Sequence, residues 1–121
     1  KTLMMKERIL AINPQAKSYN YRKNYIHLKA IFFNWDDDYT YIVDAVDDVK
    51  AKINLIVNAN KHNLPIMSSM GTANKLDPQK FVITDIYKTH TCPLARIMRK
   101  TLKQQGIKKI KSPLFYRGTF Y

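Results

Sequence analysis

Several features that define large protein classes are scarce or missing in this chain of 121 residues. No apolar run approaches the ~18 residues of a membrane-spanning helix, and the opening residues, KTLMMKERIL, lack the pattern of a secretory signal. The one cysteine, Cys92, excludes an internal disulfide and a cysteine-based zinc site. The histidines His27, His62 and His90 lie too far apart for ligand spacing. We therefore expect a cytoplasmic protein without membrane attachment or a structural metal.

Glycine is also rare. The three glycines, Gly71, Gly106 and Gly118, fit neither a G-x-G-x-x-G nor a Walker pattern. A Gly-rich loop before a helix is the usual cradle for a triphosphate. If the protein binds a nucleotide in this way, we expect the loop to lie upstream of Lys1, where the sequence opens inside a helical pattern that has no N-cap residue.

Acidic residues are few and unevenly placed. Nine Asp and Glu stand against 21 Lys and Arg, which gives a net charge of +12. Six of the acids fall within 36–48, whereas 86–121 holds basic residues and no acid. This polarity indicates a polyanionic partner, most simply a nucleic acid. The alternative is a basic surface that only keeps the protein soluble.

Hydrophobic periodicity divides the chain into short elements. Helical spacing is expected for 1–12, 49–62 and 93–105. Strand-like apolar runs are expected for 40–46, 64–67 and 81–87, with weaker indications of a strand over 18–22 and a helix over 24–35. Because a strand, a helix and a strand follow one another, the sequence predicts an α/β fold with a mostly parallel sheet and flanking helices, as one domain over 1–121.

The helix over 93–105 is predicted to have a cationic face. Thr91 fits its N-cap, Pro93 its first turn and Gly106 the position after its end. Its apolar stripe is formed by Leu94, Ile97, Met98 and Leu102. Another face, about 100° wide, carries Arg96, Arg99, Lys100 and Lys103. Cations spaced along one helix can follow a phosphate backbone, although basic helix faces are also common as solvated surfaces.

Three carboxylates lie at the C-terminal end of the predicted strand over 40–46. They are Asp44, Asp47 and Asp48, in the stretch VDAVDD. Ligands of open α/β sheets bind beyond the carboxyl ends of the strands. One carboxylate there could hold Mg²⁺ together with the phosphates of a nucleotide. Alternatively, Asp47 or Asp48 only caps the next helix and complements its dipole.

Four stretches, taken in order, resemble the ThiF/MoeB/HesA adenylating superfamily, and the last two are similar to its tRNA threonylcarbamoyladenosine dehydratase branch. They are KTLMMKERILAINP (1–14), YIVDAVDDVKAK (41–52), PIMSSMGTANKLDP (65–78) and FVITDIYKTHTCPLARIMRKTLK (81–103). The resemblance covers most of 1–14 and 39–111. Residues 15–38 match loosely, and the tail 112–121 departs from the family's pattern.

The resemblance implies the C-terminal part of a Rossmann-like adenylation domain, with the Gly-rich phosphate loop in a preceding part. Such a domain belongs to an ATP- and Mg²⁺-dependent homodimer of the ligase class. It would adenylate the carboxylate of threonylcarbamoyladenosine in tRNA, after which intramolecular attack closes a ring and AMP leaves. Cys92 does not match the cysteine that carries acyl groups or sulfur in the superfamily.

The resemblance also assigns residues. Lys1 matches the lysine that contacts the ATP phosphates, and Asp47 matches the catalytic aspartate that binds metal and nucleotide. Asp44 belongs to the same motif in a supporting role, and Lys52 takes a position that is often basic in nucleotide-binding relatives. The cations of the helix over 93–105 would then dock tRNA, with Lys108, Lys109 and Lys111 as an extension.

Two rival functions stay open at this point. A sulfur-carrier adenylyltransferase of the same superfamily would activate the C-terminal Gly-Gly of a small acidic carrier protein, which also suits a basic surface. A non-enzymatic, basic α/β module would bind RNA in a salt-sensitive manner without turning over ATP.

Overall fold

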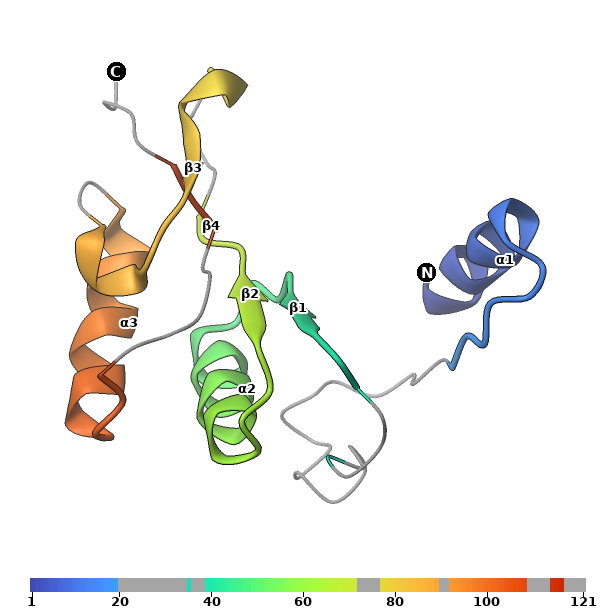
Figure 1. Cartoon of the computed structure of the whole chain (residues 1–121). Helices are drawn as coiled ribbons and strands as arrows, with labels where there is room; N and C mark the ends of the chain where they lie inside the picture. Colours follow the sequence, from blue (N-terminus) through green and yellow to red (C-terminus); the bar gives the residue numbers. More distant parts are fainter. Residues whose placement is uncertain (20–34, 36–38, 72–76, 90–91, 109–113, 117–121) are drawn as a thin grey trace. The chain divides into compact units, whose positions relative to one another are not determined.

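A computed structural model describes residues 1–19, 35, 39–71, 77–89, 92–108 and 114–116. Most of the two weaker predictions, for 18–22 and 24–35, lies outside these residues. The chain divides into two units, Lys1–Phe33 and Asn34–Tyr121, which are described separately below (Figure 1).

The N-terminal unit contains one described helix, α1, which spans Thr2–Ile12. The predicted stop at Asn13-Pro14 is confirmed, because Asn13 is the C-cap and its backbone N–H donates to the carbonyl oxygen of Ile9 at 2.8 Å. No residue of α1 is buried by the described residues, and most of its large apolar side chains are exposed. The helix predicted for 1–12 is therefore confirmed by the backbone.

A parallel pair of strands forms the centre of the second unit. Strand β1 spans Ile42–Asp44 and strand β2 spans Ile66–Ser68, with Ile42 opposite Ile66 and Asp44 opposite Ser68. Both strands therefore end at the same edge of the sheet. Helix α2, Val49–Lys61, connects them and lies against both strands. The predicted α/β arrangement with a parallel sheet is confirmed.

Helix α2 begins and ends at defined residues. The Asp48 carboxylate accepts a hydrogen bond from the backbone N–H of Ala51 at 2.7 Å, so Asp48 is the N-cap. The chain leaves the helix through Asn63, whose φ of 55° lies in the left-handed region that asparagine tolerates. The buried face of α2 contributes Ala51, Leu55, Ile56 and Ala59 to the core.

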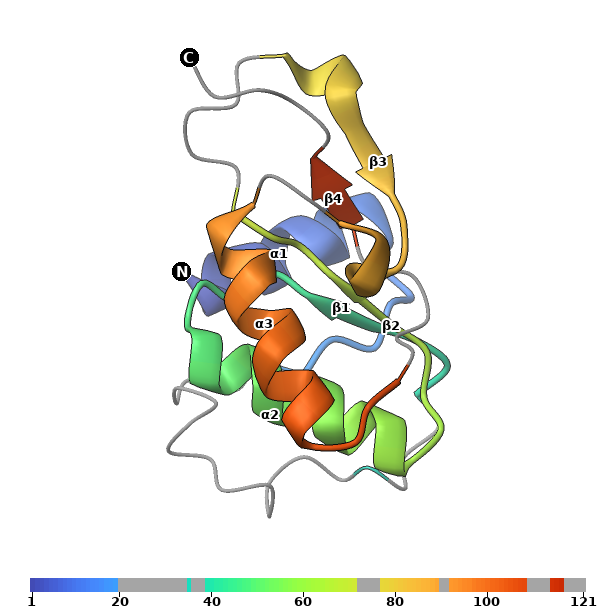
Figure 2. The ribbon, with the colours of Figure 1, turned by 90° about the vertical axis from the view of Figure 1, so that its left-hand side faces the viewer.

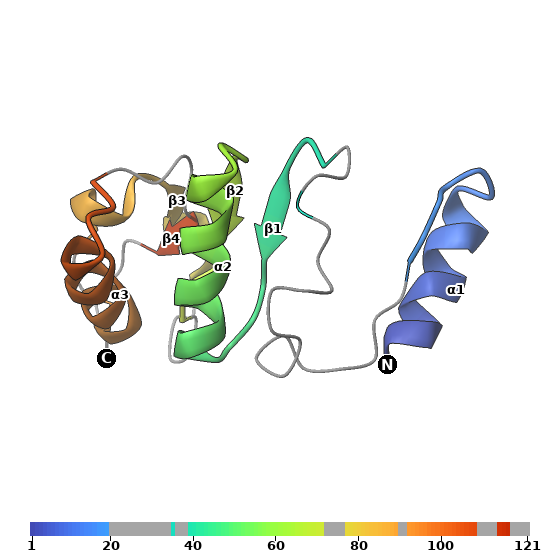
Figure 3. The same cartoon turned by 90° about the horizontal axis from the view of Figure 1, so that it is seen from below.

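Helix α3 spans Pro93–Gln104 and packs beside α2 (Figures 2 and 3). Its predicted start at Pro93 is confirmed, but the N-cap position belongs to Cys92 and not to Thr91, and Cys92 makes no side-chain capping bond. The predicted role of Gly106 is confirmed by its φ of 75°. Gly106 N–H donates to Lys103 and Ile107 N–H to Leu102, which is a Schellman ending.

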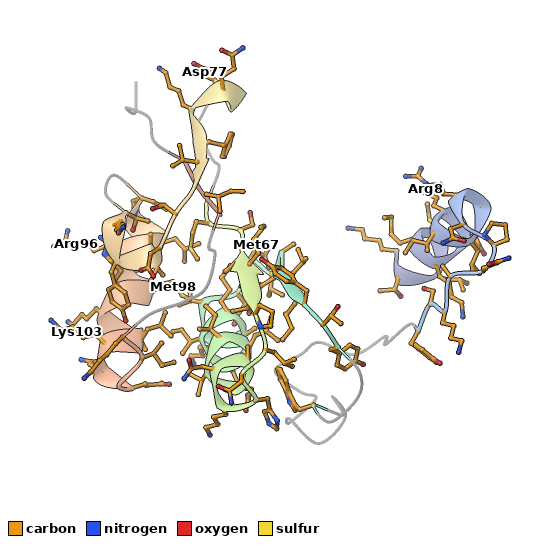
Figure 4. The ribbon with its side chains drawn as sticks, in the orientation of Figure 1. Arg8, Met67, Asp77, Arg96, Met98 and Lys103 are labelled. Atoms are coloured by element: carbon orange, nitrogen blue, oxygen red, sulfur yellow. The ribbon has the colours of Figure 1, made fainter. Side chains whose placement is uncertain are left out.

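The buried face of α3 differs in part from the predicted stripe. Met98 and Leu102 are buried as predicted, and Met98 points toward α2 in Figure 4. Ala95 completes the buried face, whereas Ile97 is 52% exposed. The helix thus directs the small side chain of Ala95 into the core, and Ile97 lies at the edge of the buried face.

A second, antiparallel pair of strands completes the unit. Strand β3, Phe81–Ile83, pairs with strand β4, Leu114–Tyr116 (Figure 1). The predicted strand over 81–87 is too long, because the Asp85 carboxylate accepts from Tyr87 N–H and begins a 3₁₀ turn over Ile86–Lys88. Another 3₁₀ turn, Pro78–Lys80, precedes β3. None of the helices in the described part of the chain is long and apolar enough to cross a bilayer.

Candidate nucleotide site

A buried ion pair lies at the common edge where β1 and β2 end. The ammonium group of Lys52, on the first turn of α2, lies 3.0 Å from a carboxylate oxygen of Asp44 at the end of β1. Both side chains are buried, at 1% and 0% exposure. Ser68, at the end of β2, donates a hydrogen bond to the same carboxylate oxygen. The charges predicted from the sequence to face a nucleotide are thus directed at each other.

The remaining bonds of this pair are also made within the protein. Lys52 Nζ donates to the Ser69 carbonyl oxygen at 2.6 Å and to Ser68 Oγ at 3.4 Å. The other carboxylate oxygen of Asp44 accepts from the backbone N–H of Val46 at 3.0 Å. An ammonium group has three donors, and all three have an acceptor here. In this arrangement the Lys52 ammonium group has its acceptors within the protein, and its contact with a nucleotide stays a prediction.

Asp47 and Asp48 have separate environments. Asp48 caps α2, as the capping alternative required, whereas Asp47 does not. The Asp47 side chain is exposed, and within the described residues it makes neither a hydrogen bond nor an ion pair. Of the three predicted carboxylates, Asp47 alone therefore offers both oxygens to a ligand.

The donor set has consequences for a bound metal. No three His, Cys, Asp or Glu side chains in the described ranges lie close enough to hold a metal ion by themselves. A single free carboxylate suits Mg²⁺ that arrives with the phosphates of its nucleotide, because Mg²⁺ keeps waters and needs one or two carboxylates. The residues present thus fit a nucleotide-bound Mg²⁺ held by Asp47, and they do not fit a closed metal cage.

Lys1 lies in the other unit of the chain. It is the exposed N-cap residue of α1 and makes no side-chain capping bond, while its carbonyl oxygen accepts from Met5 N–H at 3.1 Å. The Lys1 ammonium group makes no capping hydrogen bond to α1. Its contact with ATP phosphates stays a prediction.

The basic face of α3 is a second candidate surface. Arg96, Lys100 and Lys103 are exposed, and Arg96 and Lys103 point outward on the side of α3 away from α2 (Figure 4). Arg99 is half-buried and donates from its guanidinium group to Thr89 Oγ1. A surface hollow of about 660 Å³ is lined by Cys92, Pro93, Arg96, Ile97, Arg99 and Lys100. Cations and one exposed apolar side chain therefore share a concave surface.

Sequence reasoning missed the serines of the strand-end network. Ser68 and Ser69 fall in a segment that the sequence indicates only as an apolar run followed by a polar loop. Ser68 joins the network because the register of the parallel strands places it opposite Asp44. That register is not visible in the sequence.

The chain is similar to known tRNA-modifying proteins. It is 42% identical over 107 residues to the tRNA threonylcarbamoyladenosine dehydratase of Bacillus subtilis, which covers 88% of this chain and 41% of that protein. It is 30% identical over 103 residues to the Escherichia coli protein of the same name, covering 85% and 38%. The chain thus spans about two fifths of the length of these relatives. No protein-family profile matches it.

A solved structure supports the same relationship. The crystal structure of the E. coli dehydratase in complex with ATP superposes with a TM-score of 0.86 at 27% identity, over 98% of this chain and 51% of that one. This likeness confirms the predicted partial Rossmann-like fold. The sequence motifs, the strand-end carboxylates and these matches lead to one conclusion: the chain belongs to the tRNA threonylcarbamoyladenosine dehydratase branch of the ThiF/MoeB/HesA superfamily.

Proposed function

We propose that this chain is part of an ATP-dependent dehydratase that closes a ring in N6-threonylcarbamoyladenosine of tRNA. The observation that carries the proposal is the 42% identity over 88% of the chain to a dehydratase of that name. The exposed carboxylate of Asp47 also supports the proposal, because it could hold the metal ion of a nucleotide. Within the described residues it has no partner of its own, whereas the neighbouring Asp44 is already paired with Lys52. The E. coli relative with the same fold binds ATP.

The proposed reaction makes a poor electrophile reactive. An oxygen of the substrate carboxylate attacks the α-phosphorus of ATP, and pyrophosphate leaves. Intramolecular attack on the resulting acyl-adenylate then closes the ring, and AMP leaves. Asp47 would hold Mg²⁺, which when bound neutralises charge on the phosphates. Lys1, by the family resemblance, would contact phosphates of ATP.

The basic face of α3 would hold the tRNA. Arg96, Lys100 and Lys103 are exposed on one side of the helix, and the described part of the chain after Ile86 offers them no acid as a partner. Lys108, also exposed, lies just beyond the end of the helix and extends this face. Lys109 and Lys111 lie outside the described residues. Cations at this spacing replace the counterions of a phosphate backbone.

A homodimer and a cytoplasmic location belong to the same proposal. The homodimer rests on the family resemblance, and the cytoplasmic location rests on the single cysteine of the chain. Light scattering on the purified protein would measure the mass of the assembly. A mass of one chain in solution would remove the homodimer from the proposal and leave the reaction untouched.

Substrate-dependent pyrophosphate release tests the reaction. The full-length protein is mixed with ATP, Mg²⁺ and one of three acceptors: tRNA bearing threonylcarbamoyladenosine, tRNA lacking it, or a carrier protein ending in Gly-Gly. We expect pyrophosphate release only when the acceptor is the modified tRNA. Release with the carrier protein alone would favour the sulfur-carrier adenylyltransferase. Salt-sensitive tRNA binding without any release would favour the non-enzymatic module.

A further inference from the structure

We infer that Lys52 and Asp44 are positioning residues that fix the turn carrying Asp47, and that they do so without touching the nucleotide. This inference rests on the proposed function, because it assigns the way in which the Asp47 carboxylate is held for its ligand. It gives the buried ion pair a task beyond the nucleotide contact that the family resemblance implies for these two positions.

The ion pair joins three elements at one point. Asp44 ends β1, Lys52 lies in the first turn of α2, and Ser68 ends β2. Lys52 Nζ reaches Asp44 Oδ2 at 3.0 Å and the Ser69 carbonyl oxygen at 2.6 Å. The backbone N–H of Ser69 in turn donates to the Asp44 carbonyl oxygen at 2.8 Å. The strand ends and the helix start are therefore tied to each other by one ammonium group and its partners.

The turn that carries Asp47 is anchored at both ends, and at one of them by the ion-pair network. On one side, Asp44 Oδ1 accepts from the backbone N–H of Val46 at 3.0 Å. On the other side, Asp48 caps α2 through Ala51 N–H at 2.7 Å. Asp47 lies between these two anchors with a side chain that is free within the described residues. The orientation of its carboxylate thus depends on where the Asp44 carboxylate is held.

A charged anchor is needed because the Asp44 side chain is fully buried. A buried carboxylate without a compensating cation is strongly unfavourable, so Lys52 determines whether Asp44 can stay at this place. If Lys52 is removed alone, we expect Asp44 to turn toward water. Its bond to Val46 N–H is then lost, and the turn loses its first anchor.

A purely stabilising ion pair would behave differently. Replacing both charged groups together, in Asp44→Asn/Lys52→Met, leaves neither charge unpaired and so avoids the main cost of a single replacement. A stabilising pair then predicts normal catalysis in every variant that folds normally. A positioning pair predicts a defect that persists in such a variant. Without the Lys52 ammonium group, the side chain at position 44 is no longer tied to the end of β2, and its bond to Val46 N–H is weakened.

The experiment uses the full-length protein with Lys52→Met, the double variant and Lys61→Met as the control, since Lys61 is exposed at the other end of the same helix. Thermal unfolding measures the fold. Turnover of modified tRNA gives kcat, the KM for tRNA and the dependence on Mg²⁺ concentration. Hydrogen exchange followed by mass spectrometry compares the segment 45–48 with 95–104 in α3, and this readout needs no turnover.

We expect the folded double variant to lose at least about tenfold in kcat and to need more Mg²⁺, because small misplacements of a catalytic group are costly. Its KM for tRNA should not change, and 45–48 should exchange faster while 95–104 does not. Normal exchange of 45–48 together with a normal Mg²⁺ dependence in a variant of normal stability would overturn the inference.

If the double variant does not fold, Ser68→Ala decides in its place. It keeps both charges and removes one hydrogen bond to Asp44. Faster exchange of 45–48 supports positioning, and unchanged exchange overturns it. A wild-type protein that releases no pyrophosphate with modified tRNA refutes the proposed function instead, and the exchange experiment still decides between an anchored turn and a free one.

Discussion

Replacing the exposed cations of α3 by glutamine should weaken tRNA binding and reduce its dependence on salt. The first variant changes Arg96, Lys100 and Lys103, which are exposed and lie on one face of the helix. A second variant adds Arg99. The first variant leaves Arg99 in place because it is half-buried and donates to Thr89 Oγ1, so its change also removes a contact within the protein.

The expected magnitude follows from the number of exposed cations. Each phosphate contact contributes about 0.7–0.9 to the slope of log K against log salt, so three contacts contribute about 2–3. At about 0.15 M salt, this slope corresponds to a loss of roughly a hundredfold in affinity. Arg99 should add at most about one further unit of slope, because one side of its guanidinium group is already engaged.

Fluorescence anisotropy with labelled tRNA at several salt concentrations measures both quantities. The control variant replaces three exposed lysines elsewhere, Lys50, Lys61 and Lys80, and so removes the same charge from α2 and from the 3₁₀ turn before β3. The change at Lys80 also removes its exposed ion pair with Asp77. A docking face predicts that the α3 variant loses much more affinity than the control and that ATP binding is unchanged in both. Equal losses in the two variants would show that only net charge matters. An unchanged slope in the variant lacking all four α3 cations would refute the docking surface.

Three further predictions concern single residues. Asp47→Asn should abolish ATP–pyrophosphate exchange and change the free energy of unfolding by no more than about 0.5 kcal/mol, since Asp47 is exposed and Asp48 is the helix cap; near-normal exchange would remove its proposed metal role. Lys1→Ala should raise the KM for ATP through the loss of one positive charge, and an unchanged KM with an unchanged kcat would make Lys1 an ordinary solvated residue. Burial and the neighbouring Asp85 carboxylate raise the pKa of Tyr87 above its ordinary value of 10.0. The folded state therefore holds this proton longer than the unfolded state, and stability should be lost as the pH rises above about 10. Tyr87→Phe should flatten that loss, as measured by urea unfolding at several alkaline pH values.

The elements of the fold were largely predictable where local signals agreed. Helices α2 and α3 follow from their apolar spacing, from Pro93 in the first turn and from Gly106 after the end. The N-cap of α3 was missed because Thr91 has the better capping side chain, while the chain uses Cys92 without a capping bond. Strand β4 was missed because its pairing with β3 joins segments about 30 residues apart, and such contacts leave no local pattern.

The candidate site was predictable in position but not in connectivity. The run of carboxylates after a buried strand located Asp44, Asp47 and Asp48 at the strand edge. It could not show which carboxylate is paired, which caps a helix and which is free, because these roles depend on the positions of Lys52 and Ser68 in space. The family resemblance placed Lys52 among the nucleotide-binding positions, and the structure shows in addition that its buried ammonium group contacts a carboxylate and two other oxygen acceptors of the protein.

The buried thiol of Cys92 can be used to measure how often the N-terminal end of α3 opens. It is the single thiol in the sequence, it is 4% exposed, and it sits at the residue before the first turn of α3. Because so little of Cys92 is exposed, an alkylating reagent should react with it mainly in molecules whose α3 start has moved away from the core, even though the residue borders the hollow beside Arg96. In the regime of fast reclosing, the labelling rate therefore measures how often that end of the helix opens. The same helix carries the cations assigned to tRNA, so labelling with and without tRNA would show whether the bound nucleic acid holds this end closed.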